Sequence, residues 1–167
     1  MRLINSFVAT VIAFSVVGGI GSADQARAAG KFVFTAIPDQ DESKLRKRFG
    51  KVANYLSKEL GMKVEYVPVK SYAAAVTAFR NNQVQLAWFG GLSGVRARLL
   101  VKGSTAIAQG KKDPFFETYF IAHSSTGLSY SKNFPKGIAG KTFTFGSKGS
   151  TSGRLMPEYH IRQAFGK

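Results

Sequence analysis

Between residues 31 and 99, segments typical of β-strands alternate with segments typical of helices, and this alternation restricts the possible folds most. The predicted strands, rich in apolar, aromatic and β-branched residues, are 31–37, 63–69 and 84–89. The predicted helices, with apolar residues at helical spacing, are 42–60, 71–80 and 91–99. Gly61 suits the end of the first helix, and Ser71 suits the N-cap of the second. The pattern predicts an α/β fold with a doubly wound parallel sheet.

The remainder of the chain continues this pattern less regularly. Further strands are predicted at residues 105–109, 117–123 and 141–145, and a helix is predicted at residues 154–165. The intervening segment 124–140 is rich in Ser, Gly and Lys, and we expect it to connect two lobes. Because Pro157 has no backbone N–H, the last helix is expected to begin late or to be distorted near its first turn.

The N-terminus has the order of a secretory signal peptide. Arg2 precedes an apolar stretch at residues 4–20, and Ala26-Arg27-Ala28 follows in a region of small residues. This order predicts cleavage after Ala28, so that residues 1–28 are the signal peptide. A membrane anchor is the alternative, but the Asn, Ser, Thr and Gly residues within the stretch make it weakly apolar for a permanent span. Export without a lipid-bearing cysteine predicts a periplasmic protein.

Cysteine content and charge restrict the function further. The chain of 167 residues has no cysteine, which excludes disulfides, thiol catalysis and zinc–cysteine sites. It carries 24 Lys and Arg against 9 Asp and Glu, a net charge of +15. Such a charge is typical of proteins that bind nucleic acid, an anionic membrane surface or a small anion, although lysines can also serve solubility alone. Export disfavours nucleic acid as the partner.

Three consecutive hydroxyl residues, Ser150, Thr151 and Ser152, lie between the predicted strand at 141–145 and the last predicted helix. A helix start offers unpaired backbone N–H groups and the positive end of the helix dipole, and nearby hydroxyls add further donors. The segment therefore predicts a site for a small oxyanion. The alternative is a simple helix cap, which needs only one of the three hydroxyls. The residues alone leave both interpretations open.

The predicted topology places other segments at the same edge. Ligands of open α/β sheets bind beyond the carboxyl ends of the strands. The predicted pocket walls are residues 38–42, 70–72, 89–93 and 147–152. Tyr72 opens the second predicted helix, where its phenol suits either an oxyanion or the apolar core. Trp88 and Phe89 are expected to lie in the core, and the glycines after them allow close approach of the backbone.

Catalysis and metal binding find little support in the sequence. Residues 146–153 lack the order of glycine and lysine that a nucleotide P-loop requires. His123 and His160 do not adjoin an obvious nucleophile. The acids in residues 39–42 lack a further ligand at metal-binding spacing. We therefore expect no enzyme activity, no metal and no cofactor.

Four stretches of the sequence match a known family. They are Ala36-Ile-Pro-Asp-Gln-Asp-Glu42, Tyr72-Ala-Ala-Ala-Val76, Val84-Gln-Leu-Ala-Trp-Phe-Gly90 and Gly149-Ser-Thr-Ser-Gly-Arg-Leu-Met-Pro157. In this order they resemble the phosphate-, phosphite- and phosphonate-binding proteins of ABC importers. The resemblance extends over nearly all of the chain from Phe32 onward, and the Trp-Phe-Gly and Ser-Thr-Ser-Gly-x-x-x-Pro elements are specific when they occur together.

The resemblance implies a periplasmic-binding-protein-like (type II) architecture, in which two lobes close around an oxyanion and deliver it to a permease in the inner membrane. The family's anion contacts correspond to Ser150, Thr151 and Ser152, and a family tyrosine corresponds to Tyr72. Residues 29–121 then form the first lobe, and residues 122–167 form a partial second lobe, because family members continue beyond this point with further ligand groups. A small phosphonate, phosphite or phosphate is the implied ligand, with no cofactor and no nucleic acid.

Other functional classes stay open. The chain is alternatively a non-functional fragment that keeps the binding-protein fold, or a cationic protein that binds nucleic acid or anionic surfaces. A periplasmic phosphatase would require a nucleophile or a metal pair that the sequence does not reveal.

Overall fold

A computed structural model describes residues 31–134 and 136–166, so the predicted signal peptide at residues 1–28 lies outside the described part. Strands β1 (Phe32–Ala36), β2 (Val64–Tyr66) and β3 (Leu86–Trp88) form a parallel sheet in the order β2-β1-β3. The predicted α/β class and the parallel sheet are therefore confirmed, although β2 and β3 are shorter than the sequence pattern indicated.

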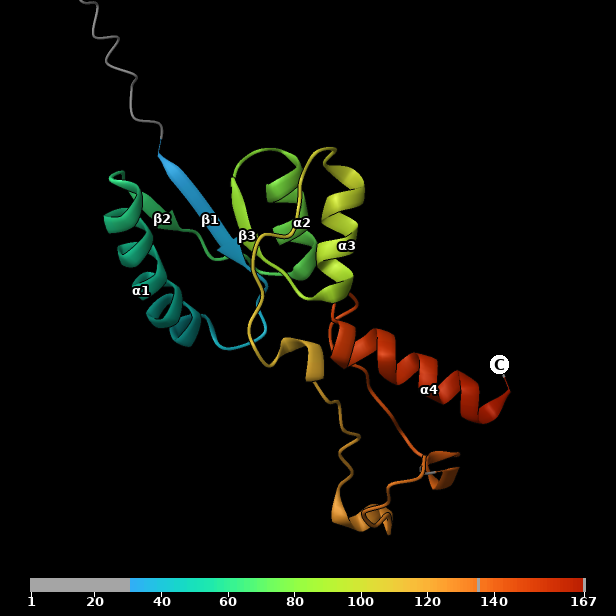
Figure 1. Cartoon of the computed structure of the whole chain (residues 1–167). Helices are drawn as coiled ribbons and strands as arrows, with labels where there is room; N and C mark the ends of the chain where they lie inside the picture. The colour runs from blue at the N-terminus through green and yellow to red at the C-terminus, as the bar shows by residue number, and fades with distance from the viewer. Residues whose placement is uncertain (1–30, 135, 167) are drawn as a thin grey trace, which may run out of the picture.

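Three helices connect and follow these strands: α1 (Glu42–Leu60), α2 (Tyr72–Arg80) and α3 (Gly91–Leu100). Helix α1 lies on one side of the sheet, and α2 and α3 lie together on the other (Figure 1). Gly61 ends α1 in the left-handed conformation with a φ of 61°, which glycine adopts without a steric penalty. The hydroxyl of Ser71 accepts a hydrogen bond from the Ala74 N–H at 3.0 Å and caps α2. Both predicted helix boundaries are confirmed.

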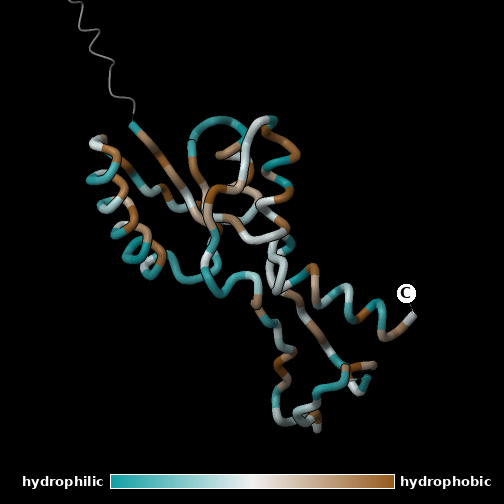
Figure 2. Tube along the Cα trace, in the orientation of Figure 1, coloured by the Kyte–Doolittle hydropathy of each residue, from teal (hydrophilic) through white to brown (hydrophobic). Residues whose placement is uncertain are grey.

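The hydrophobic core lies between the sheet and α1. The ring of Phe34 in β1 is 6.1 Å from that of Phe49 in α1 and 5.4 Å from that of Tyr66 in β2. Apolar residues run along β1 and recur along α1 (Figure 2). The buried members of the cluster are Phe34, Ala36, Leu45, Phe49, Ala53 and Val64. This packing gives residues 31–101, hereafter the first region, a hydrophobic core on the α1 side of the sheet.

Residues 102–166, hereafter the second region, contain no strand in their described part. The strands predicted at 105–109, 117–123 and 141–145 are therefore wrong. These segments are extended or irregular, and the short turns around them are η1 (Asp113–Phe115), η2 (Ser124–Thr126) and η3 (Lys136–Ile138). A strand is stable only where a neighbouring backbone pairs with its N–H and C=O groups, and alternation of side chains does not supply that neighbour.

Aromatic contacts hold the second region together. Phe120 lies 5.3 Å from Phe134 and 5.9 Å from Phe143, measured between ring centroids, and Phe134 lies 6.3 Å from Phe165. Pro157 is nevertheless the only buried residue beyond Ala97 in the described part of the chain. The predicted lobe boundary near residue 121 stays a prediction.

The last helical segment begins with a π-helical turn, η4 (Thr151–Leu155), that continues into α4 (Met156–Phe165). The N–H of Leu155 donates to the carbonyl of Ser150, five residues earlier, at 3.1 Å. Pro157 lies in the first turn of α4, directly after the π-helical turn, and its missing N–H removes one donor from the continuous helical segment. The expected distortion of this helix start is confirmed.

None of the described helices is both long and apolar enough to span a bilayer.

Candidate functional site

The loop that precedes η4 lies against the N-terminus of α2. Tyr72, the first residue of α2, is half-buried and contacts Gly149. A Cβ atom at Gly149 would overlap the Cβ of Tyr72, so only glycine permits this approach of the loop. The contact brings Tyr72 beside the Ser150–Ser152 segment, as the sequence predicted from their shared position at the sheet edge.

Thr151 joins the start of η4 to the start of α3. Its Oγ1 accepts a hydrogen bond from the Leu92 N–H at 2.8 Å, across 59 residues of sequence. A Cβ at Gly91 would lie 3.3 Å from the same oxygen, so the small residue leaves room for this bond. The hydroxyl thereby satisfies a donor in the first turn of α3, which has no partner within its own helix.

Ser150 acts as the N-cap of η4. Its Oγ accepts a hydrogen bond from the Gly153 N–H at 2.9 Å. The Gly153 carbonyl in turn accepts from the Gly146 N–H at 2.7 Å, which closes the loop on itself. The capping interpretation is therefore correct for the Ser150 hydroxyl, and this hydroxyl shapes the loop.

Other polar groups at this helix start have no partner within the described part of the chain. The backbone N–H groups of Thr151 and Ser152, the Ser152 hydroxyl and the Tyr72 hydroxyl form no hydrogen bond with any described residue. The backbone of Ser152 is held at its carbonyl, which accepts a hydrogen bond from the Thr118 hydroxyl at 2.7 Å. An oxyanion placed here would meet free donors and the positive end of a helix dipole.

Charged groups next to the helix start favour an anion as well. Arg154 lies with its guanidinium carbon 4.2 Å from the centre of the Phe145 ring, and its Nε donates to Glu158 at 2.7 Å. Hydrogen bonds from Arg162 and Arg154 lower the pKa of the Glu158 carboxyl below its ordinary value. The carboxylate therefore stays ionised at neutral pH and holds Arg154 at the first turn.

The four predicted pocket walls meet through specific contacts. Glu42, at the start of α1, accepts a hydrogen bond from the Lys70 ammonium at 2.7 Å, and the contacts of Tyr72 with Gly149 and of Leu92 with Thr151 join the other walls. Trp88 itself is 44% exposed, so its predicted core position is wrong; it is the last residue of β3 and lies at the carboxyl end of the strand. Phe89 is half-buried and packs edge-on against Phe79 with 5.8 Å between ring centroids.

Within the described residues, no group of three or more His, Cys, Asp or Glu side chains is arranged to hold a metal ion. The donors that converge at the Ser150–Ser152 segment are amides and hydroxyls, which suit an anion better than a cation.

Sequence reasoning missed the residues that position this site. The Leu92 amide and the Thr118 hydroxyl reach η4 across 59 and 34 residues of sequence, and no local pattern indicates such contacts. Gly149 was noted only as a loop glycine, although its contact with Tyr72 requires the absence of a side chain. The glycine-rich composition of the loop was the one available signal.

Comparison with known proteins supports the same family throughout the described region. The family model described as ABC transporter, phosphonate, periplasmic substrate-binding protein matches residues 34–167. The probable ABC transporter phosphite binding protein PhnD1 of Prochlorococcus marinus (strain MIT 9301) is 48% identical over 131 residues, which is 77% of this chain and 44% of the relative. The phosphate-import protein PhnD of Mycolicibacterium smegmatis (strain ATCC 700084 / mc(2)155) is 32% identical over 126 residues, or 73% of this chain and 38% of the relative.

A solved structure is also similar. The structure of PhnD1 from Prochlorococcus marinus (MIT 9301) in complex with methylphosphonate matches with a TM-score of 0.65 and 42% sequence identity. The match covers 80% of this chain and 50% of that chain, and the chain spans less than half the length of the curated relatives. The predicted resemblance and the periplasmic-binding-protein-like fold are confirmed. The chain belongs to the family of periplasmic substrate-binding proteins of phosphonate ABC transporters.

Proposed function

We propose that this chain is the solute-binding component, or a part of it, of an ABC importer for phosphonate, phosphite or phosphate in the periplasm. The observation that carries the proposal is the helix start at Thr151, where two backbone N–H groups and the Ser152 hydroxyl have no partner in the described chain, in a family defined by phosphonate binding. The proposed partner is an ABC permease of the inner membrane, and the proposed route of export is the signal peptide at residues 1–28. No catalytic step belongs to this function.

The proposed contacts divide the four candidate residues into two kinds. Ser152 and Tyr72 offer hydroxyls that are not used within the described chain, so they are proposed to contact the anion directly. The side-chain oxygens of Ser150 and Thr151 already accept hydrogen bonds from the Gly153 and Leu92 N–H groups. These two residues are therefore proposed to act mainly through backbone N–H groups and through the shape of the loop.

A titration followed by amide NMR tests this proposal. Methylphosphonate, phosphite and phosphate are added separately to the purified chain at millimolar concentrations. At this scale a Kd of 1 mM corresponds to a binding free energy of about 4 kcal/mol. We expect saturable shifts of the Thr151 and Ser152 amides, weakened by Ser152→Ala and by Tyr72→Phe. Each lost hydrogen bond to a charged ligand should weaken binding by roughly tenfold.

Ser43→Ala is the matched control, because the exposed Ser43 side chain makes no hydrogen bond with the described residues and lies outside the predicted pocket walls. Its affinity should equal that of the unmodified chain. The absence of any shift at Thr151 and Ser152 with all three anions would contradict the proposal, as would equal affinity of the Ser152→Ala variant and the control.

A further inference from the structure

A second concentration of positive charge lies beside the candidate oxyanion site. A pocket of about 230 Å³ is lined by residues of α3, of the loop before η4, and of η4 and α4. The lining residues are Leu92, Arg96, Lys148, Arg154, Leu155 and Glu158. None of Tyr72, Ser150, Thr151 and Ser152 contributes to it. The pocket is therefore distinct from the helix-start site, although both share the segment that begins at Thr151.

Two of the three cations that line this pocket, Arg96 and Lys148, are not paired with an acid of the described chain. Glu158 is its one acidic lining residue, and both carboxylate oxygens are already engaged. Oε2 accepts from Arg154 Nε at 2.7 Å, and Oε1 accepts from Arg162 Nη2 at 2.9 Å. Within the described chain, Arg96 and Lys148 form no hydrogen bond or ion pair with an acid. Two positive charges therefore remain without a counter-charge at the pocket.

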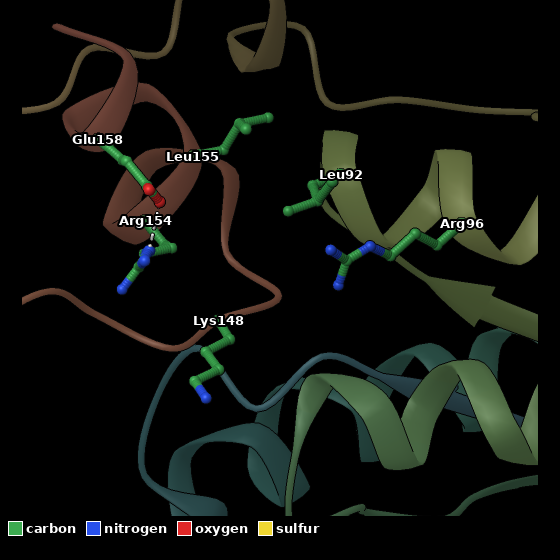
Figure 3. A pocket seen from close by; sticks show the side chains of 6 residues that line it. All are labelled: Leu92, Arg96, Lys148, Arg154, Leu155 and Glu158. Carbon is green, nitrogen blue, oxygen red and sulfur yellow. Dashed lines mark hydrogen bonds and ion pairs between the residues drawn. The ribbon is translucent and has the colours of Figure 1, made fainter. Parts of the chain in front are cut away.

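The side chains also have a suitable arrangement. Figure 3 shows the guanidinium of Arg96 extending from α3 toward the segment that carries Lys148 and Arg154. Leu92 and Leu155 lie along another part of the same hollow and supply apolar surface. A guanidinium binds a phosphoryl or phosphonyl group through paired hydrogen bonds, and an ammonium adds a point charge. The two leucines would contact a short aliphatic group joined to such an anion.

We propose that this pocket is a second anion site, which takes a small dianionic oxyanion with a short apolar substituent. Arg96 and Lys148 bind the charged head, and Leu92 and Leu155 contact the substituent. Arg154 contributes positive potential while its Nε remains on Glu158. The site is open and shallow compared with a ligand cavity for a drug-sized molecule, so its affinity is expected to be low and sensitive to salt.

Side-chain NMR with propylphosphonate and inorganic phosphate as probes tests the site. We expect the Arg96 Nε–Hε resonance and the Lys148 amide to shift in a saturable manner, with tighter binding of propylphosphonate because only its chain reaches the leucines. The variant with both Arg96→Gln and Lys148→Gln lacks the Arg96 reporter, so its affinity is read from the amides of Leu92 and Leu155, which it retains. It should bind propylphosphonate at least about tenfold more weakly, the equivalent of one strong charge-assisted interaction.

A matched variant separates the pocket from the general positive charge of the chain. The double substitution Arg98→Gln with Lys102→Gln removes the same charge from exposed positions that do not line the pocket. This variant should bind propylphosphonate like the unmodified chain. Equal losses in the two double variants, or no shift of the Arg96 Nε–Hε resonance in the unmodified chain, would overturn the proposal. Equal affinity for phosphate and propylphosphonate would overturn the role of the leucines.

The second site can fail or succeed independently of the proposed importer function. The Tyr72→Phe and Ser152→Ala substitutions alter the helix-start site and leave every lining residue of the pocket unchanged. Propylphosphonate should still shift the Arg96 Nε–Hε resonance in a variant that carries both substitutions. Loss of that response together with the Thr151 and Ser152 shifts would show that only one site exists and would contradict the proposal.

Discussion

The first and second regions of the chain are similar in length but differ in how they are held together. Apart from Pro157, all the buried apolar side chains of the described chain lie between Phe34 and Ala97, in the first region. The second region instead has aromatic rings that touch one another while remaining partly exposed, such as Phe143 at 43% exposure. The candidate site is therefore asymmetric: its α2 and α3 groups lie on helices that have buried residues such as Ala75 and Ala97, whereas its η4 groups depend on a few specific contacts.

Truncation of an aromatic residue in each region should give the largest contrast in stability. Phe49 is 7% exposed and lies 5.1 Å from the ring of Tyr66, so Phe49→Ala removes buried area and leaves a cavity. We expect a loss of about 3–5 kcal/mol in the free energy of unfolding of the first region. Phe143→Ala should cost less than about 1 kcal/mol, because the ring keeps much of its water contact in the folded state. Urea unfolding followed by circular dichroism measures both, and equal losses would contradict the division into a packed and a loosely packed region.

The contact between the two regions at Tyr72 should be broken by Gly149→Ala. The new Cβ would overlap the Cβ of Tyr72, so the loop must move away from α2. A steric change of this kind costs about 1–3 kcal/mol. We expect faster hydrogen exchange of the Leu92 amide, because its acceptor Thr151 follows the displaced loop. Gly50→Ala is the control, since a Cβ there meets no atom within 4 Å; it should leave exchange at Leu92 unchanged.

Two serine caps allow a matched comparison with a smaller effect. Ser71 caps α2 in the first region and Ser150 caps η4 in the second, through hydrogen bonds of 3.0 Å and 2.9 Å. Each change to Ala should cost about 1 kcal/mol of local stability. Ser71→Ala should lower the midpoint of the main unfolding transition, whereas Ser150→Ala should increase hydrogen exchange only around Gly153. A lowered midpoint in both variants would show that the two regions unfold as one unit.

The smallest effect concerns pH and helix α4. Hydrogen bonds from Arg162 and Arg154 lower the folded-state pKa of Glu158 below its ordinary value of 4.5. The contribution of this carboxylate to α4 is therefore present above the unfolded-state pKa, and it is lost as the pH falls through the lower folded-state pKa. Carbon chemical shifts of α4 should report reduced helicity on acidification below pH 4.5, and Glu158→Gln should reduce this change. The core contacts of the first region, such as Phe34 with Phe49, should persist over the same pH range.

Sequence patterns predicted the first region well because its structure is dictated by local properties. The helix from Glu42 to Leu60 and its end at Gly61 follow from apolar spacing and from the φ that glycine tolerates. The cap at Ser71 follows from the preference of serine for a helix start. The parallel sheet follows from the alternation of strands and helices, since parallel neighbours require crossovers of this length.

The strands predicted in the second region are wrong because a local sequence pattern does not show whether a partner strand is present. Residues 141–145 alternate as a strand should, yet no described backbone pairs with them. Trp88 was placed in the core on the same local grounds, and it lies exposed at the carboxyl end of β3. Pairing of strands and coverage of an edge depend on which distant segments arrive there, so periodicity cannot decide them.

The sequence by itself determined the α/β class, the helix boundaries of the first region and the hydroxyl-rich helix start, because these depend on residue preferences within a few positions. The tertiary structure alone decided what each hydroxyl does. Ser150 caps η4, Thr151 binds the Leu92 amide, and Ser152 keeps its hydroxyl unused within the described chain. The tertiary structure also brought Arg96 and Lys148, which are 52 residues apart in the sequence, to one pocket. Long-range packing sets these partners, because a hydrogen bond or an ion pair forms only between groups that the folded backbone brings within reach.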